Sequence, residues 1–106
     1  MTDSPKNTSS DSKPQLQLIP PEAARVMAAS LARGAKHGPW NWREHQIALM
    51  KHLGAILRHT FAIIAGEWVD AEGNDHLGAI MATAGIIADA RLHQTLTDDR
   101  PKGAKT

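Results

Sequence analysis

The chain has 106 residues, which is enough for one small domain. Its 12 basic and 11 acidic side chains leave a formal net charge of +1, so no broad field attracts DNA, RNA or an anionic membrane, and we expect none of them as a partner. Neither a cysteine nor a signal-like or membrane-spanning apolar run occurs, which excludes disulfides and thiolate metal sites and favours a cytoplasmic protein.

Both ends of the chain are predicted to lie outside the fold. Residues 1–14 consist almost entirely of Ser, Thr, Asp, Asn, Lys and Pro, a composition typical of a disordered tail. Residues 98–106 combine acids, Pro, Gly and basic side chains, which stop a helix and then fray as a flexible tail. The folded domain is therefore expected to span residues 15–97.

Within this domain the apolar residues recur at helical spacings. A first helix is expected from Pro21, a residue suited to a first helical turn, to just before Gly34. The segment HGPWNWREH, residues 37–45, interrupts the pattern with Gly and Pro and predicts a loop.

Two longer helices are expected after this loop. The first, over residues 44–69, carries an amphipathic stripe at spacings of three and four: Ile47, Met50, Leu53, Leu57, Phe61 and Ile64. The second, over residues 76–96, is nearly apolar until Asp89, which indicates a helix buried on most sides. No alternating strand pattern of useful length occurs, so we predict an all-α fold of three main helices whose last two form a long antiparallel hairpin.

The small size of the domain also bears on its assembly. A domain of this length buries only about 60% of the surface of its unfolded chain, which makes a lone monomer marginally stable. We therefore expect a homo-oligomer, either a dimer or a tetramer.

The stretch GEWVDAEGNDH, residues 66–76, places five ionisable side chains between two apolar segments. Glu67 and Asp70 are three residues apart at the expected end of a helix, so they would share a face and offer oxygens to a hard cation such as Mg²⁺ or Mn²⁺. Acids at this end oppose the helix dipole, which favours a neutralising partner. Solvated charges in a turn are the alternative.

Histidines recur every seven residues at positions 45, 52 and 59, a spacing that forms a stripe on a helix but is too wide for a two-histidine zinc site. His59 stands on the same helical row as Asp70 and follows Arg58, a guanidinium suited to phosphate. A half-buried histidine bonded to backbone is the alternative.

The WNW segment contains two indoles and an amide that suit a nucleobase. Trp40 and Trp42 could stack on a base, Asn41 could bind its edge, and Lys36 could pair with phosphates. Plugging of a small core by the two indoles is the alternative.

Five segments together resemble a known family. They are LIPPEAA from Leu18, GAKHGPWNW from Gly34, AILRH from Ala55, AGEWVDAEGNDHL from Ala65 and TLTDDRP from Thr95. In this order they resemble the phage and bacterial domain described as the N-terminal domain of dATP/dGTP diphosphohydrolases, which is related to the all-α, MazG-like nucleotide pyrophosphohydrolases. The resemblance covers nearly the whole folded part.

The resemblance implies a reaction and a set of site residues. The reaction is the Mg²⁺- or Mn²⁺-assisted attack of water on the α-phosphorus of a deoxynucleoside triphosphate, with a purine base suspected, which releases the monophosphate and pyrophosphate. The implied catalytic residues are Glu67, Asp70, His59 and His76. The implied metal ligands are Glu67, Asp70, Asp75 and His76. For substrate binding we expect Lys36, Asn41, Trp42 and Arg58.

One position departs from the family pattern. The resemblance implies His-x-x-His at the start of the last helix and a polar residue one turn later, whereas this chain has His76, Ala79 and then Thr83. Asp75 could stand in for the missing group, and Asp89 is turned roughly 140° away from that face. The alternative function is therefore a catalytically degenerate helical module that binds nucleotide or serves only assembly.

Overall fold

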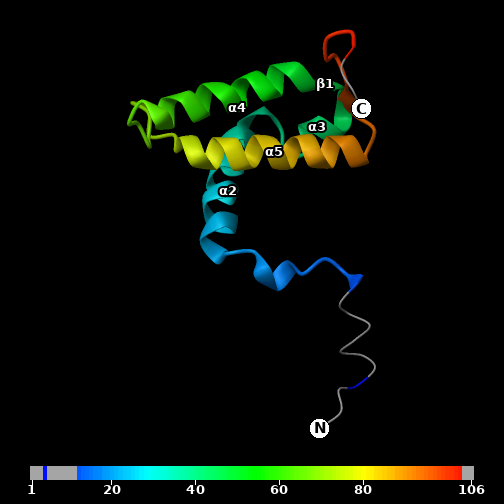
Figure 1. Cartoon of the computed structure of the whole chain (residues 1–106), viewed down its shortest axis with the longest axis horizontal. Helices are drawn as coiled ribbons and strands as arrows, with labels where there is room; N and C mark the ends of the chain where they lie inside the picture. Colours follow the sequence, from blue (N-terminus) through cyan, green and yellow to red (C-terminus); the bar gives the residue numbers. More distant parts are fainter. Residues whose placement is uncertain (1–3, 5–11, 104–106) are drawn as a thin grey trace.

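The computed structural model describes Ser4 and residues 12–103 (Figure 1). Its helices are α2 (Pro21–Gly34), α3 (Asn41–Glu44), α4 (Leu49–Ile64) and α5 (His76–Leu92), with 3-10 turns η2 (Leu16–Leu18) and η3 (Ala35–His37). Two short strands, β1 (Ile47–Ala48) and β2 (Leu96–Thr97), complete the described elements. The all-α prediction is confirmed. Most of the predicted disordered tail, and the last three residues of the predicted flexible tail, lie outside the described residues.

The three main helices form a layered arrangement in which α5 lies in the middle. The antiparallel hairpin of α4 and α5 is confirmed, and α2 packs across α5 (Figure 1). Because α5 has a neighbour on two sides, it is apolar around most of its circumference, and its buried positions include the small residues Gly78, Ala82 and Ala90. Among the described residues, no helix combines the length and the apolar character that crossing a membrane needs.

The first helix forms as predicted, from Pro21 at its first turn to Gly34. The predicted loop at residues 37–45 is wrong in part, because residues 41–44 form the short helix α3. The chain turns into α3 through Gly38, at φ 101°, and through Trp40, whose φ of 64° is left-handed.

The predicted helix over residues 44–69 is too long at both ends. At its start the backbone N–H of Ile47 donates to the carbonyl of Thr95 at 2.9 Å, and β1 pairs with β2 in parallel, with Ile47 opposite Leu96. At its end the chain leaves the helix through Gly66, whose φ of 101° suits a glycine after a helix C-terminus. The two strands are too short to give an alternating pattern in the sequence, and their pairing joins segments far apart in the chain.

The last helix begins where predicted and ends earlier, at Leu92 instead of residue 96. Asp75 is its N-cap, and its carboxylate accepts hydrogen bonds from the N–H groups of Leu77, at 2.8 Å, and Gly78, at 3.2 Å. After β2, Asp99 accepts a hydrogen bond from the N–H of Met50 at 2.9 Å. The first residues of the predicted flexible tail thus contact the start of α4.

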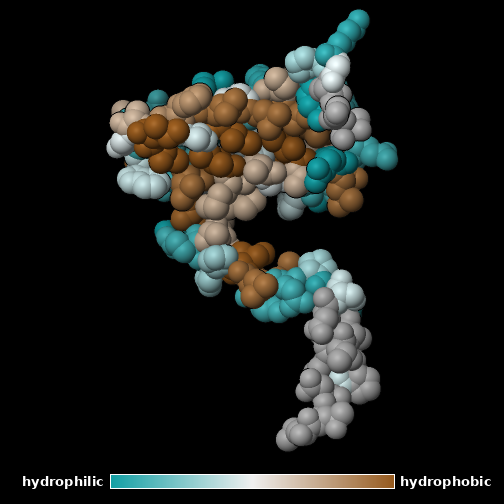
Figure 2. All heavy atoms as spheres, viewed as in Figure 1, coloured by the Kyte–Doolittle hydropathy of each residue, from teal (hydrophilic) through white to brown (hydrophobic). Residues whose placement is uncertain are grey.

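Much of the amphipathic stripe predicted for this helix is exposed in the chain. Leu57, Phe61 and Ile64 are 56%, 65% and 74% exposed, whereas the opposite side of α4 packs on α5. Figure 2 shows hydrophobic residues gathered over the layer that contains α4 and α5. Ala82 and Ala90 are the only buried hydrophobic residues among those described, so the single chain has a small core.

We predict that Gly78→Ala destabilises the protein. A Cβ at this position would lie 2.9 Å from the carbonyl oxygen of Val26 and 3.1 Å from its Cγ1, so α2 and α5 would have to move apart. The expected loss is about 1–3 kcal/mol in the free energy of unfolding, measured by urea denaturation. Gly54→Ala, whose Cβ meets only the end of Arg58 at 3.6 Å, is the matched control and should be neutral or stabilising. Equal stability of the two variants would contradict the prediction.

Candidate functional site

A chain of three side chains joins α4, the turn and α5. Glu67 Oε1 lies 2.6 Å from His76 Nε2, and His76 Nδ1 lies 2.8 Å from His59 Nδ1. His76 is buried, with 6% of its surface exposed, whereas the side chain of Glu67 is 54% exposed. The structure thus brings together three of the four residues expected to be catalytic.

The geometry determines the proton positions when both imidazoles are neutral. A carboxylate only accepts, so His76 Nε2 carries the proton that it donates to Glu67. His76 Nδ1 is then an acceptor, and His59 Nδ1 must donate to it. This leaves a lone pair on His59 Nε2, which has no hydrogen-bond partner among the described residues. The arrangement is a base oriented by a second and a third group.

Burial lowers the pKa of His59 below its ordinary value, and the neighbouring charge of a protonated His76 lowers it further. Arg58 acts in the same direction, whereas Asp70 opposes it. His59 is consequently a neutral imidazole at pH 7, able to accept a proton from water or to bind a metal ion.

Asp70 organises the turn. Its Oδ1 accepts hydrogen bonds from the backbone N–H groups of Glu72 and Asn74, both at 2.9 Å, and its Oδ2 accepts from the side-chain amide of Asn74 at 3.0 Å. The backbone and then the side chain of Asn74 lower the pKa of Asp70. The expected shared helical face of Glu67 and Asp70 is wrong, because α4 ends at Ile64 and both acids lie in the turn that follows.

The carboxylates near the histidines differ in their freedom to bind a cation. Asp70 uses both of its oxygens in the turn, whereas Asp75 uses Oδ1 alone at the N-terminus of α5. The outer oxygen of Glu67 has no partner among the described residues, and no three potential metal ligands converge within that part of the chain. Because Mg²⁺ is commonly held by one or two carboxylates together with substrate phosphates, Glu67 fits such an ion, and Asp75 stays a predicted ligand.

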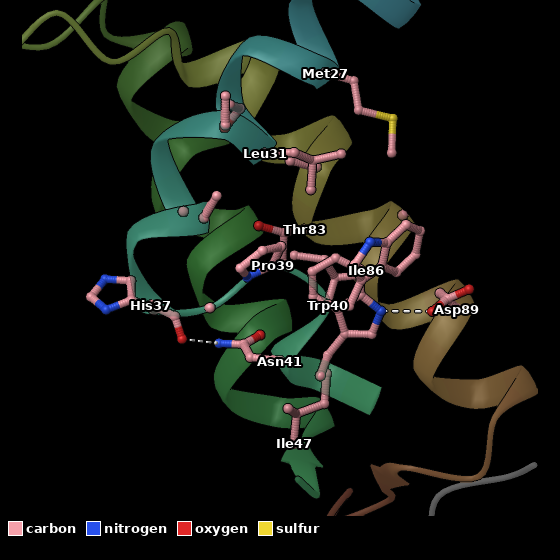
Figure 3. A pocket seen from close by; sticks show the side chains of 18 of the residues that line it. Met27, Leu31, His37, Pro39, Trp40, Asn41, Ile47, Thr83, Ile86 and Asp89 are labelled. Carbon is pink, nitrogen blue, oxygen red and sulfur yellow. Dashed lines mark hydrogen bonds between the residues drawn. The ribbon is translucent and has the colours of Figure 1, made fainter. Parts of the chain in front are cut away.

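A groove of about 820 Å³ lies between α2, the segment from η3 to α3, and α5 (Figure 3). Trp40, Asn41 and Trp42 line it together with the α2 residues Met27 and Leu31. On α5 the wall includes Ala79, Thr83 and Ile86. Ala79 follows His76 by three residues, which places it on the same side of the helix, so the position that departs from the family pattern is a wall of the groove.

The sequence did not predict the hydrogen bonds that Asp89 makes beside the groove. Asp89 accepts a hydrogen bond from Trp42 Nε1 at 2.7 Å, drawn as a dashed line to Asp89 in Figure 3. It also accepts two from the Arg43 guanidinium, at 2.7 and 2.9 Å. The hydrogen bonds from Arg43 and then Trp42 hold the pKa of Asp89 far below its ordinary value. The signal in the sequence was a lone acid in an apolar helix, which requires a partner when it is partly buried.

The other expected residues divide between two regions. Asn41 and Trp42 line the groove, whereas Lys36 is exposed on η3 outside its lining. Arg58 is exposed beside His59 on α4. The histidine stripe is broken, because His45 lies before α4 and, together with His52, lines the groove, while His59 contacts His76.

A comparison with protein families identifies the chain. The family model described as dATP/dGTP diphosphohydrolase, N-terminal, matches residues 3–100. The chain belongs to this family. No curated protein and no solved structure was found to match it. The family description indicates a role in nucleotide hydrolysis, and it names dATP and dGTP.

We predict that His59 titrates below about 6.5, the ordinary histidine value. The pKa of His59 is lowered on folding, so its contribution to stability is complete above the unfolded value and is lost as the pH falls through the folded one. NMR titration of the imidazole protons measures this pKa directly. The Tm advantage of wild type over His59→Gln should also shrink from pH 8 to pH 5. A His59 that titrates above 6.5 would contradict the geometry described.

We predict that Asp89→Asn lowers the Tm at pH 7, because Arg43 loses its ionic partner. The folded-state pKa of Asp89 is depressed, so its contribution is present above about pH 4 and is lost in more acidic solution. The Tm difference between the two proteins should therefore close below that pH. The control is Glu44→Gln, which removes an exposed acid from α3, the short helix that contains Arg43. This variant should leave the Tm unchanged.

Proposed function

We propose that this chain hydrolyses dATP or dGTP to the monophosphate and pyrophosphate. The observation that carries the proposal is the hydrogen-bonded series Glu67, His76 and His59 one helical turn from the groove wall. The family description supplies the class of substrate.

In the proposed reaction a water molecule attacks the α-phosphorus of the nucleotide. The bond between this phosphorus and the oxygen that bridges to the β-phosphate breaks, and pyrophosphate leaves with the electron pair. His59 Nε2 takes the proton of the attacking water, since its lone pair is free when Nδ1 donates to His76. His76 and Glu67 hold the imidazole in the required tautomer and stabilise its positive charge after proton transfer.

The proposal includes a divalent cation, Mg²⁺ or Mn²⁺. Glu67 would hold it through its outer oxygen, with the substrate phosphates as further ligands. Such a cation neutralises phosphate charge and polarises the phosphoryl group. Asp70 contributes negative charge nearby while its oxygens maintain the turn.

The groove is suited to the nucleoside part. Its volume of about 820 Å³ lies within the range of small-molecule sites, roughly 300–1,000 Å³. Trp40 and Trp42, with ring centroids 5.3 Å apart, provide apolar faces, and the Trp42 N–H is already committed to Asp89. Asn41 would supply amide groups for the edge of a base, and Arg58, which is exposed on α4 next to His59, would pair with phosphate.

A second function is favoured by one observation at the same site. Ala79 is on the groove wall one turn after His76, where the family resemblance implies a histidine. A methyl group there can neither bind a metal ion nor position water. The alternative is a module that binds deoxynucleoside triphosphates without turnover.

We expect pyrophosphate release from dATP or dGTP with Mn²⁺ or Mg²⁺ and little release from dCTP or dTTP. His59→Gln should lower kcat by about 10²–10⁴-fold, the range for loss of a general base. Glu67→Gln should abolish release by removing a ligand and the charge that orients His76. Glu72→Gln, an exposed acid in the same turn, is the matched control and should keep wild-type activity.

Tryptophan fluorescence during nucleotide titration separates the two functions. The binding module would be established by two results together. The wild-type chain would show quenching without pyrophosphate release, and the Ala79→His variant would release pyrophosphate. Absence of both quenching and turnover with every triphosphate would refute both functions.

A further inference from the structure

The outward side of α4 carries a row of large apolar side chains. Met50, Leu57, Phe61 and Ile64 are 40%, 56%, 65% and 74% exposed. At about 100° per residue they fall within an arc of about 60°. His59 lies on the opposite side, where α4 contacts α5. We call these four residues the α4 stripe.

Two further exposed apolar side chains follow the end of the helix in the chain. Trp68 and Val69, in the turn after α4, are 62% and 49% exposed. Trp68 directly follows Glu67, so the far end of this surface adjoins the candidate site. Between Met50 and Leu57 the row passes Gly54, beside which the end of the Arg58 side chain lies, so Leu57, Phe61 and Ile64 form its uninterrupted part.

Such a set differs from the scattered exposed leucines of ordinary proteins, because four of its members share one side of one helix and the other two follow in the next turn. If a fully exposed large side chain presents about 200 Å², the six exposed fractions correspond to roughly 700 Å² per copy. Two such surfaces placed face to face would bury roughly 1,400 Å², which is within the range of stable, specific interfaces. Because the core of the single chain is small, burying these apolar side chains against a partner would add to its stability.

We propose that the α4 stripe is the interface with a second copy of this chain, with the two α4 helices packed against each other about a two-fold axis. A two-fold interface must be complementary to itself, and a straight row of uncharged apolar side chains meets this requirement when the second helix runs antiparallel. Phe61 lies near the middle of the surface, close to the axis. The assembly then has the order α2, α5, α4, α4, α5, α2, and both α4 helices are covered on two sides. This inference does not depend on the proposed function.

The test is the self-association of the full chain, measured by analytical ultracentrifugation from 1 to 100 μM. Wild type should be a dimer or an even-numbered oligomer, and Phe61→Glu should raise the dimer Kd at least 100-fold. Leu92→Glu is the matched control, because Leu92 is 76% exposed at the end of α5, away from the α4 stripe, and this variant should associate like wild type. A wild type that is monomeric at 100 μM would overturn the proposal, as would equal association of the two variants.

Cross-linking tests the same contact without adding a charge to the α4 stripe. The chain has no cysteine, so Phe61→Cys introduces a single thiol. Near the two-fold axis it should be joined to its counterpart by a short bis-maleimide, whereas Leu92→Cys should not. A further full-length variant, Leu16→Asp with Leu18→Asp, examines the exposed apolar residues of η2. Loss of association in that variant, with Phe61→Cys left uncross-linked, would place the interface at the N-terminal segment and refute the α4 pairing.

Discussion

The buried imidazole of His76 is the contact on which the arrangement of the hairpin depends. Its backbone N–H donates to the carbonyl of Trp68 at 2.9 Å, Nε2 contacts Glu67, and Nδ1 contacts His59. One residue thus connects the turn, the end of α4 and the start of α5. A buried imidazole without these partners would destabilise the fold, so the hydrogen bonds that place α5 beside α4 also orient the candidate base. Stability and proposed chemistry share the same three side chains.

Much of the fold could be predicted from local signals. Pro21, Gly34 and the N-cap Asp75 are determined by neighbours within a few residues, and the helix boundaries beside them are close to those predicted. The parallel pairing of Ile47 with Leu96 could not be predicted, because two-residue strands have no period and depend on a distant partner. Helical periodicity also could not predict that the α4 stripe is exposed, because it identifies an apolar face of a helix but not the surface that covers that face.

The candidate site was predictable in composition and less so in geometry. Residue type and spacing indicated Glu67 and His59, the family resemblance added His76, and the structure brings the three into contact. Asp70 was expected to share a helical face with Glu67, yet Gly66 ends the helix first and the backbone of the turn uses the carboxylate. Asp89 was set aside because it points away from His76, and its partners Trp42 and Arg43 come from a helix 47 and 46 residues away in the sequence. Sequence spacing cannot reveal contacts of this kind.

The pairing of β1 with β2 has a consequence for motion. The hairpin of α4 and α5 is joined at one end by its turn and at the other by this clasp, to which the hydrogen bond between Met50 and Asp99 adds a further link. Neither helix has an open end from which to fray, so local opening of one requires release of the other. Amide hydrogens of both helices should then exchange with solvent as one cooperative unit. A ligand bound at either end would slow exchange along the whole pair.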